Sequence, residues 1–155
     1  MSTRTGPVIV VGVDGSPAAA AALTWAIKEA TRQHGTVHAV SVRRAPELMP
    51  ATSFALEPHG LRAPDRGEAA SAERLHELIE QAKAGVADPV DVLAITVVGD
   101  PEVELAKAAA DADMLVVGGH GQGPLAEVFL GSVAAGAVRH APCPVVVIPN
   151  QIVQQ

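Results

Sequence analysis

Three glycines and a serine recur at fixed intervals in the stretch GGHGQGPLAEVFLGS, residues 118–132. They are Gly118, Gly121, Gly131 and Ser132, in the pattern G-x2-G-x9-G-S. Chance would place such a pattern in a chain of this length and composition about once in a hundred tries. Glycine has no Cβ, so a phosphate oxygen can approach its main-chain N–H group closely. The pattern predicts a phosphate site, with a simple tight turn as the alternative reading.

Two more residues that could contact a nucleotide stand at or near the ends of apolar runs. Asp14 ends PVIVVGVD, and Val42 lies at the end of TVHAVSVR. The Asp14 carboxylate can accept a hydrogen bond from adenine or a ribose hydroxyl, and Val42 can supply an apolar wall for the base. Asp14 could instead cap the first helix or bond to the Gly15 turn. The Ser132 hydroxyl can donate to a phosphate oxygen or coordinate magnesium.

Five short runs rich in β-branched residues alternate with helical patterns, so the chain is predicted to be an α/β protein. The alternation predicts a single doubly wound, Rossmann-like parallel sheet with helices on both faces, in the common order 3-2-1-4-5. In that order the first and fourth strands are neighbours, and a crevice opens beyond their carboxyl ends. The predicted strands are residues 7–14, 36–43, 91–99, 113–119 and 144–150.

Capping residues predict where the helices begin and end. Ser16 is the expected N-cap of the first helix, with Pro17 at its first position and Gly35 as its stop. Gly131 and Ser132 open the last helix, where free N–H groups and the helix dipole favour an anion. Further helices are predicted over 68–85, over 100–112 with Asp100 as N-cap and Pro101 next, over a short segment at 124–130, and over 133–140.

Residues 44–67 interrupt this regular alternation. The segment RAPELMPATSFALEPHGLRAPDRG contains four prolines and shows no clean periodicity. It is longer than an ordinary connection between elements of a compact domain, so it is predicted to be a loop insertion. Two roles are open for it, a mobile loop or a lid over a ligand.

Composition limits the classes of function. The chain has 155 residues, predicting a single domain over 1–155, and 48% of them are hydrophobic. The net charge of −6 argues against general affinity for nucleic acid or an anionic membrane surface, which needs a basic face.

Cys143 is the only cysteine, so no intrachain disulfide can form, and it is expected to be a small core residue. No leader-like or membrane-spanning apolar segment is seen, which favours a cytoplasmic protein.

Three segments of the chain resemble the universal stress protein family. They are VVGVDGSPAAAAAL near the start, VVGDPEVEL before the third predicted helix, and DMLVVGGHGQGPLAEVFLGSVAAGAVRHAPCPVVVIP near the end. The resemblance covers nearly the whole chain except 44–67 and implies the ATP-binding branch of the family. It implies that ATP phosphates bind Gly118, Gly121, Gly131 and Ser132 and the amide of Val133. It also implies that Asp14 and Val42 contact the adenosine.

One departure from the resemblance concerns the phosphate motif. Many relatives carry Arg or Lys directly after the second glycine, where this chain has Gln122. A triphosphate would lose a favourable charge pair there, worth roughly 0.5–1 kcal/mol at an exposed site. The expected ligand is ATP as its magnesium complex, with Ser132 as a magnesium ligand, and cyclic AMP or AMP is the alternative. A module that binds no nucleotide and acts through protein contacts is the third possibility.

The sequence shows no activated nucleophile and no acid–base pair. His120 lies inside the motif but has no partner carboxylate nearby in sequence, so a catalytic role is not expected for it. We therefore expect a nucleotide-dependent regulator or sensor of the stress response, with at most weak ATP hydrolysis, rather than an enzyme. The last predicted strand, 144–150, is an apolar sheet edge, which predicts a homodimer formed by pairing that strand with a second copy.

Overall fold

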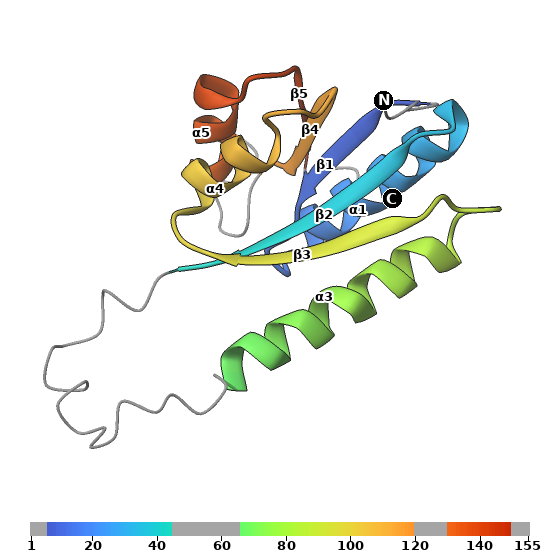
Figure 1. Ribbon diagram of the computed structural model, residues 1–155, viewed down its shortest axis with the longest axis horizontal. Helices are drawn as coiled ribbons and strands as arrows, with labels where there is room; N and C mark the ends of the chain where they lie inside the picture. Colours follow the sequence, from blue (N-terminus) through green and yellow to red (C-terminus); the bar gives the residue numbers. More distant parts are fainter. Residues whose placement is uncertain (1–5, 45–65, 120–129, 150–155) are drawn as a thin grey trace, which may run out of the picture.

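The computed structural model describes residues 6–44, 66–119 and 130–149 (Figure 1). Five parallel strands form one sheet in the order β3-β2-β1-β4-β5, which confirms the predicted topology. The strands are β1 (Val8–Gly12), β2 (Thr36–Arg43), β3 (Val92–Val98), β4 (Met114–Gly118) and β5 (Val145–Ile148). The helices are α1 (Pro17–Gln33), α3 (Arg66–Ala84), α4 (Pro101–Ala108) and α5 (Ser132–His140).

The helices form a layer on each face of the sheet, as predicted. Side chains alternate between the faces of a strand, so Ile9 and Val11 of β1 belong to the buried cluster that includes residues of α1 and α3, while Val10 belongs to the cluster that includes residues of α4 and α5. The helices that follow the neighbouring strands β1 and β4 therefore lie on opposite faces. This is the point in a doubly wound sheet where a crevice forms beyond the carboxyl ends of the strands.

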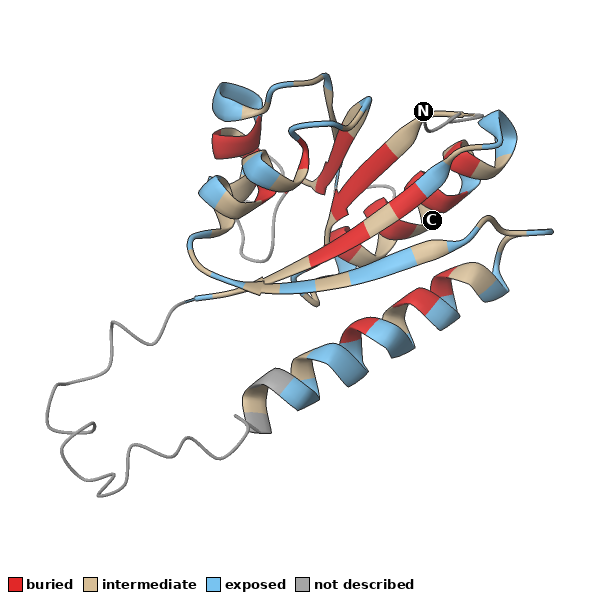
Figure 2. Cartoon of the chain, in the orientation of Figure 1, coloured by how far each residue is buried: buried red, intermediate tan, exposed pale blue. Residues whose placement is uncertain are grey.

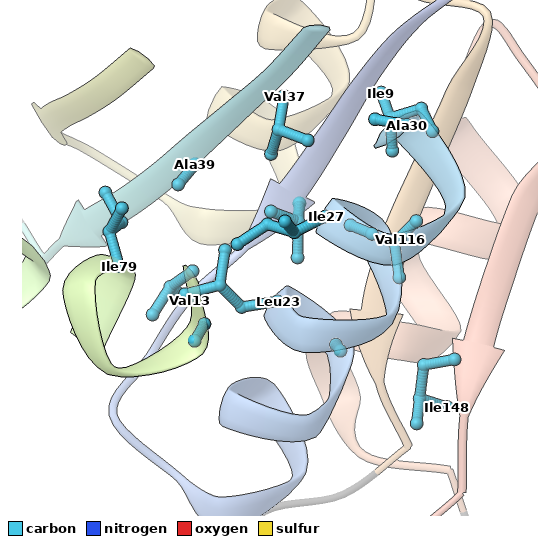
Figure 3. Packing of buried hydrophobic residues seen from close by; sticks show 14 of the residues in the cluster. Ile9, Val13, Leu23, Ile27, Ala30, Val37, Ala39, Ile79, Val116 and Ile148 are labelled. Carbon is cyan, nitrogen blue, oxygen red and sulfur yellow. The ribbon is translucent and has the colours of Figure 1, made fainter. Parts of the chain in front are cut away.

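Large aliphatic side chains fill the α1/α3 side of the sheet. Leu23 and Ile27 of α1 have no exposed surface, and Figure 3 shows both pointing toward Val13 and the side chains of the sheet. Figure 2 shows the buried positions concentrated in β1, β2, β4 and α1, whereas β3 and the outer face of α3 are largely exposed. The core is thus built around β1, β2 and β4, the strands that contain or precede predicted site residues.

Two of the predicted helix starts have the expected cap. The Ser16 hydroxyl accepts a hydrogen bond from the N–H of Ala19 at 3.1 Å, and Pro17 is the first residue of α1. The Asp100 carboxylate accepts from the N–H of Glu102 at 2.9 Å, ahead of α4. Both side chains satisfy N–H groups that have no partner within the first turn of a helix.

Several element boundaries differ from the predicted ones. The left-handed residue that ends α1 is His34, with a φ of 58°, rather than Gly35. Gly35 is required for a different reason, because a Cβ there would overlap the Pro7 carbonyl oxygen. The first strand ends at Gly12, two residues before Asp14, and α5 begins at Ser132 with Gly131 as its N-cap.

Two predictions fall outside the described residues. The short helix expected at 124–130 does so apart from Leu130, and the proline-rich insertion at 44–67 does so apart from its ends. The predicted choice between a lid and a mobile loop for that insertion stays open.

Candidate functional site

A cleft opens at the carboxyl edge of the sheet, above the ends of β1, β2 and β4 and beside the first turns of α4 and α5. Its volume within the protein is about 170 Å³. Pockets that enclose most of a small ligand measure about 300–1,000 Å³, so these walls would enclose only part of a nucleotide.

The cleft brings together every predicted site residue that the structure describes. Those residues come from four separate elements and turns, which the strand order makes neighbours. They are Asp14, Val42, Gly118, Gly131, Ser132 and Val133. Gly121 and His120 lie outside the described residues.

Asp14 lies in the turn between β1 and α1 and is exposed. Its Oδ1 atom accepts a hydrogen bond from the N–H of Ser16 at 2.9 Å, which fixes the carboxylate at the entrance of α1. This is the turn-forming role that the sequence left open. A carboxylate has several acceptor positions, so this bond leaves Oδ2 for a further donor.

The start of α5 carries the polar groups of the cleft. The Gly131 N–H donates to the Gly119 carbonyl at 2.7 Å, which ties the helix to the end of β4. That amide is therefore already bonded within the protein. The next three N–H groups, those of Ser132, Val133 and Ala134, have no acceptor in the described part of the chain. All three residues line the cleft.

The three described helices with an assigned N-cap differ in this respect. Side-chain oxygens cap α1 and α4, at Ser16 and Asp100, whereas no side chain caps α5. An N-cap glycine offers no acceptor, and the dipole of α5 adds positive potential at its first turn. The beginning of α5 can therefore bind an anion from outside the protein.

Gly118 has a packing role that the sequence did not reveal. A Cβ at this position would lie 2.8 Å from the Ala18 carbonyl carbon and 2.8 Å from its Cβ, so glycine lets α1 approach β4. The residue also lines the cleft. Its missing side chain is thus explained by contact between the elements, whether or not a phosphate is bound.

The apolar wall of the cleft includes residues that sequence reasoning missed. Leu105 of α4 is buried and contributes to the wall together with Val40, Val117 and the predicted Val42. Pro101 also lines the cleft, at the first position of α4. The only sequence signal for Leu105 was its apolar side chain within a predicted helix. That signal does not distinguish a residue in the wall of a cleft from an ordinary core residue.

Cys143 lies half-buried on the α4/α5 side, packed against the buried cluster there. Burial raises the pKa of its thiol, and the nearby Asp113 carboxylate raises it further. A thiol in this state is a poor nucleophile at neutral pH.

Two further features bear on the kinds of site and environment open to the described residues. Among them no three His, Cys, Asp or Glu side chains gather closely enough to hold a metal ion. None of their helices is both long enough and apolar enough to span a bilayer.

Most of the chain matches a known protein family. Residues 7–149 match the model of the universal stress protein family. A curated universal stress protein of Mycobacterium tuberculosis is 37% identical over 147 residues, which cover 92% of this chain and 48% of that protein. The chain spans about half the length of the curated relatives it matches.

Solved structures agree with the sequence match. The universal stress protein UspA from Lactobacillus plantarum superposes with a TM-score of 0.69 at 30% identity, covering 95% of this chain and 99% of that one. A universal stress protein solved in complex with cAMP superposes with a TM-score of 0.68 at 27% identity. That alignment covers 94% of this chain and 98% of that chain.

Proposed function

This chain belongs to the universal stress protein family, and from that premise we propose that its cleft binds an adenine nucleotide, with ATP as the first candidate. The observation that carries the proposal is the set of three N–H groups at the start of α5, on Ser132, Val133 and Ala134. They face a cleft, have no acceptor among the described residues, and lie at the positive end of a helix dipole.

The remaining walls suit adenosine. Val42, Val40 and Leu105 offer an apolar surface to a base. Asp14, whose Oδ1 is held by Ser16, has Oδ2 available for a ribose hydroxyl or the adenine amino group. Magnesium would be bound mainly by the phosphates of the nucleotide, with the exposed Ser132 hydroxyl as its protein ligand.

A smaller nucleotide is the second candidate. Gln122 leaves the predicted motif without the cation that would pair with a terminal phosphate, and the described walls enclose only about 170 Å³. One structural relative was solved with cAMP. Cyclic AMP or AMP would need only one phosphate to be held by the first turn of α5.

Calorimetric titration with ATP plus magnesium, cAMP and AMP tests the proposal. We expect binding of ATP in the micromolar range and a loss of at least about tenfold in the variant Ser132→Asp, whose carboxylate competes with phosphate for the same N–H groups. Tight cAMP binding with no detectable ATP binding would favour the second candidate. Absence of binding by all three nucleotides would overturn the proposal and leave a module that acts through protein contacts.

We propose that the protein acts in the cytoplasm as a regulator of the stress response. Its regulatory state would depend on whether a nucleotide is bound in the cleft. Asp14 is the one titratable side chain among the described residues that line the cleft, so they include no acid–base pair. ATP turnover should therefore stay well below the roughly 1 s⁻¹ at the lower end of typical enzymes. A faster rate in a phosphate-release assay would contradict a purely regulatory role.

We further propose a homodimer through the strand predicted at 144–150. The carbonyls of Pro144 and Ile148 accept from β4, so the alternate residues Val145 and Val147 direct their N–H groups to the open edge. Val147→Pro removes one outward donor without removing a bond to β4, and it should shift the protein to monomer in analytical ultracentrifugation. Leu93→Lys, at an exposed site on the opposite edge strand β3, is the control and should leave the dimer intact.

A further inference from the structure

A second cavity lies between the β1–α1 turn, the end of β2 and the first half of α3. Its volume is about 210 Å³. Leu75 and Leu78 of α3 form an apolar wall. The polar side chains around it are those of Asp14, Ser41, Arg43, Ser71 and Arg74.

This second cavity is on the other side of the β1–β2 rim from the cleft. Val40 of β2 lines only the cleft, whereas Ser41 and Arg43 line only the second cavity. Successive side chains of a strand point to opposite faces of the sheet, which accounts for this division. The second cavity is therefore on the α1/α3 side and does not include the first turn of α5.

The two cavities nevertheless meet. Val13, Asp14 and Val42 line both of them, so a group bound near Asp14 in the cleft would lie at the mouth of the second cavity. Gly15 helps to open this passage, because it has a φ of 86° and no side chain beneath Arg74. The Arg74 Nε atom lies 3.6 Å from the position that a Cβ on Gly15 would take.

The charge of the second cavity contrasts with that of the whole chain. The chain has a net charge of −6, yet the charged residues that border this cavity in the described part of the chain are two arginines and one aspartate. The Asp14 Oδ1 is bonded to the Ser16 N–H, and Arg74 has no carboxylate partner in the described part of the chain. Guanidinium groups beside serine hydroxyls are well suited to a phosphate, which accepts several hydrogen bonds at once.

We propose that the second cavity binds a phosphate group, with Arg74 as a principal contact. Two sources would supply the same chemistry. One is a second phosphate on the ribose of a nucleotide in the cleft, a version that rests on the proposed nucleotide binding. The other is free inorganic phosphate, which requires no nucleotide.

Isothermal titration calorimetry with three probes separates these sources: AMP, adenosine 3′,5′-bisphosphate and inorganic phosphate. The variant is Arg74→Ala, which alters an exposed side chain of α3 and should leave the fold intact by circular dichroism. The matched control is Arg139→Ala, an exposed arginine in the last turn of α5. Arg139 lines neither cavity.

For a ribose phosphate, the bisphosphate should bind roughly tenfold more tightly than AMP, as one charge-assisted contact implies. Arg74→Ala should reduce that preference to about twofold or less, while Arg139→Ala retains it. For free phosphate, inorganic phosphate should bind saturably with AMP already present, and Arg74→Ala should remove that binding.

If neither the preference nor phosphate binding depends on Arg74, the second cavity is not a phosphate site. This result is distinguishable from failure of the proposed function. Loss of all adenosine binding with Arg74-dependent phosphate binding would overturn the nucleotide cleft alone, and normal AMP binding without any Arg74 effect would overturn the second cavity alone.

Discussion

The two faces of the sheet are covered in different ways. Helices α1 and α3, of 17 and 19 residues, cover one face with large aliphatic side chains such as Leu23, Ile27 and Ile79. Helices α4 and α5, of 8 and 9 residues, cover the other face largely with small residues. Gly136 of α5 is one of them, since a Cβ there would overlap the carboxyl group of Glu102 in α4.

Because of this difference, the two sides should contribute unequally to the stability of the fold and to nucleotide binding. The α1/α3 side buries most of the large side chains, so it should contribute most of the hydrophobic free energy of folding. On the α4/α5 side, small residues let the two helices approach each other. The first turn of α5 lines the cleft, and no side chain caps it. We expect substitutions of the buried aliphatic side chains under α1 and α3 to change stability, and substitutions at the start of α5 to change nucleotide binding.

The largest expected effect is from truncation of Leu23, which is fully buried on the α1/α3 side. Leu23→Ala should lower the free energy of unfolding by about 3–4 kcal/mol, through lost burial and an internal cavity. Leu105→Ala, at the wall of the cleft, should lower it by only about 2 kcal/mol because that wall borders open space. Urea denaturation of both variants measures the difference, and equal losses would contradict the asymmetry.

A smaller loss is expected where the two sides meet at Gly118. Gly118→Ala places a Cβ 2.8 Å from Ala18 of α1, so it should cost about 1–3 kcal/mol by overpacking. Gly85→Ala is the matched control, because its nearest atom would be 3.7 Å away. The control should change stability by no more than about 0.5 kcal/mol in the same denaturation experiment. A similar cost for both would show that α1 does not constrain Gly118.

Ser132 should separate stability from binding most clearly. In Ser132→Asp the new carboxylate lies in the first turn of α5, at the positive end of the helix dipole, so the protein should gain about 0.3–1 kcal/mol of stability while losing nucleotide affinity. Ser132→Ala carries no charge and should have a weaker effect on binding. Thermal unfolding and calorimetry on the same samples measure both quantities. A loss of stability in Ser132→Asp would mean that the helix start is already satisfied.

The smallest effect concerns the half-buried thiol on the α4/α5 side. Because burial and the Asp113 carboxylate raise the pKa of Cys143, its thiolate should form at a higher pH than that of an exposed cysteine. The pH profile of alkylation by iodoacetamide should therefore have a higher midpoint in the folded protein than in the urea-unfolded chain. The urea-unfolded chain is the control and should titrate near the ordinary value. A folded midpoint below that of the unfolded chain would show that Cys143 is activated rather than protected.

Much of the architecture could be read from local patterns. Alternation of apolar strands with capped helices predicted the sheet order, and Ser16 and Asp100 were correctly assigned as N-caps. Local propensity could not tell that His34, rather than Gly35, takes the left-handed conformation, because the contact of Gly35 with Pro7 is made between segments distant in sequence.

The candidate site shows the same limit. Six of its predicted residues line one cleft, but their polar groups are not equally available. The Gly131 N–H is bonded to Gly119, and the Asp14 Oδ1 to Ser16. The spacing of residue types in a motif does not show which of their atoms are already hydrogen-bonded within the protein.

Periodicity and capping over short distances were enough to predict the order of the strands, the apolar character of the core and the residues that meet at the carboxyl edge. The three-dimensional arrangement was needed to show that Leu105 lines the cleft, that Gly118 makes room for α1, and that Arg43 and Arg74 border a common cavity. Each of these depends on which face of the sheet a side chain points to and on which distant helix covers that face.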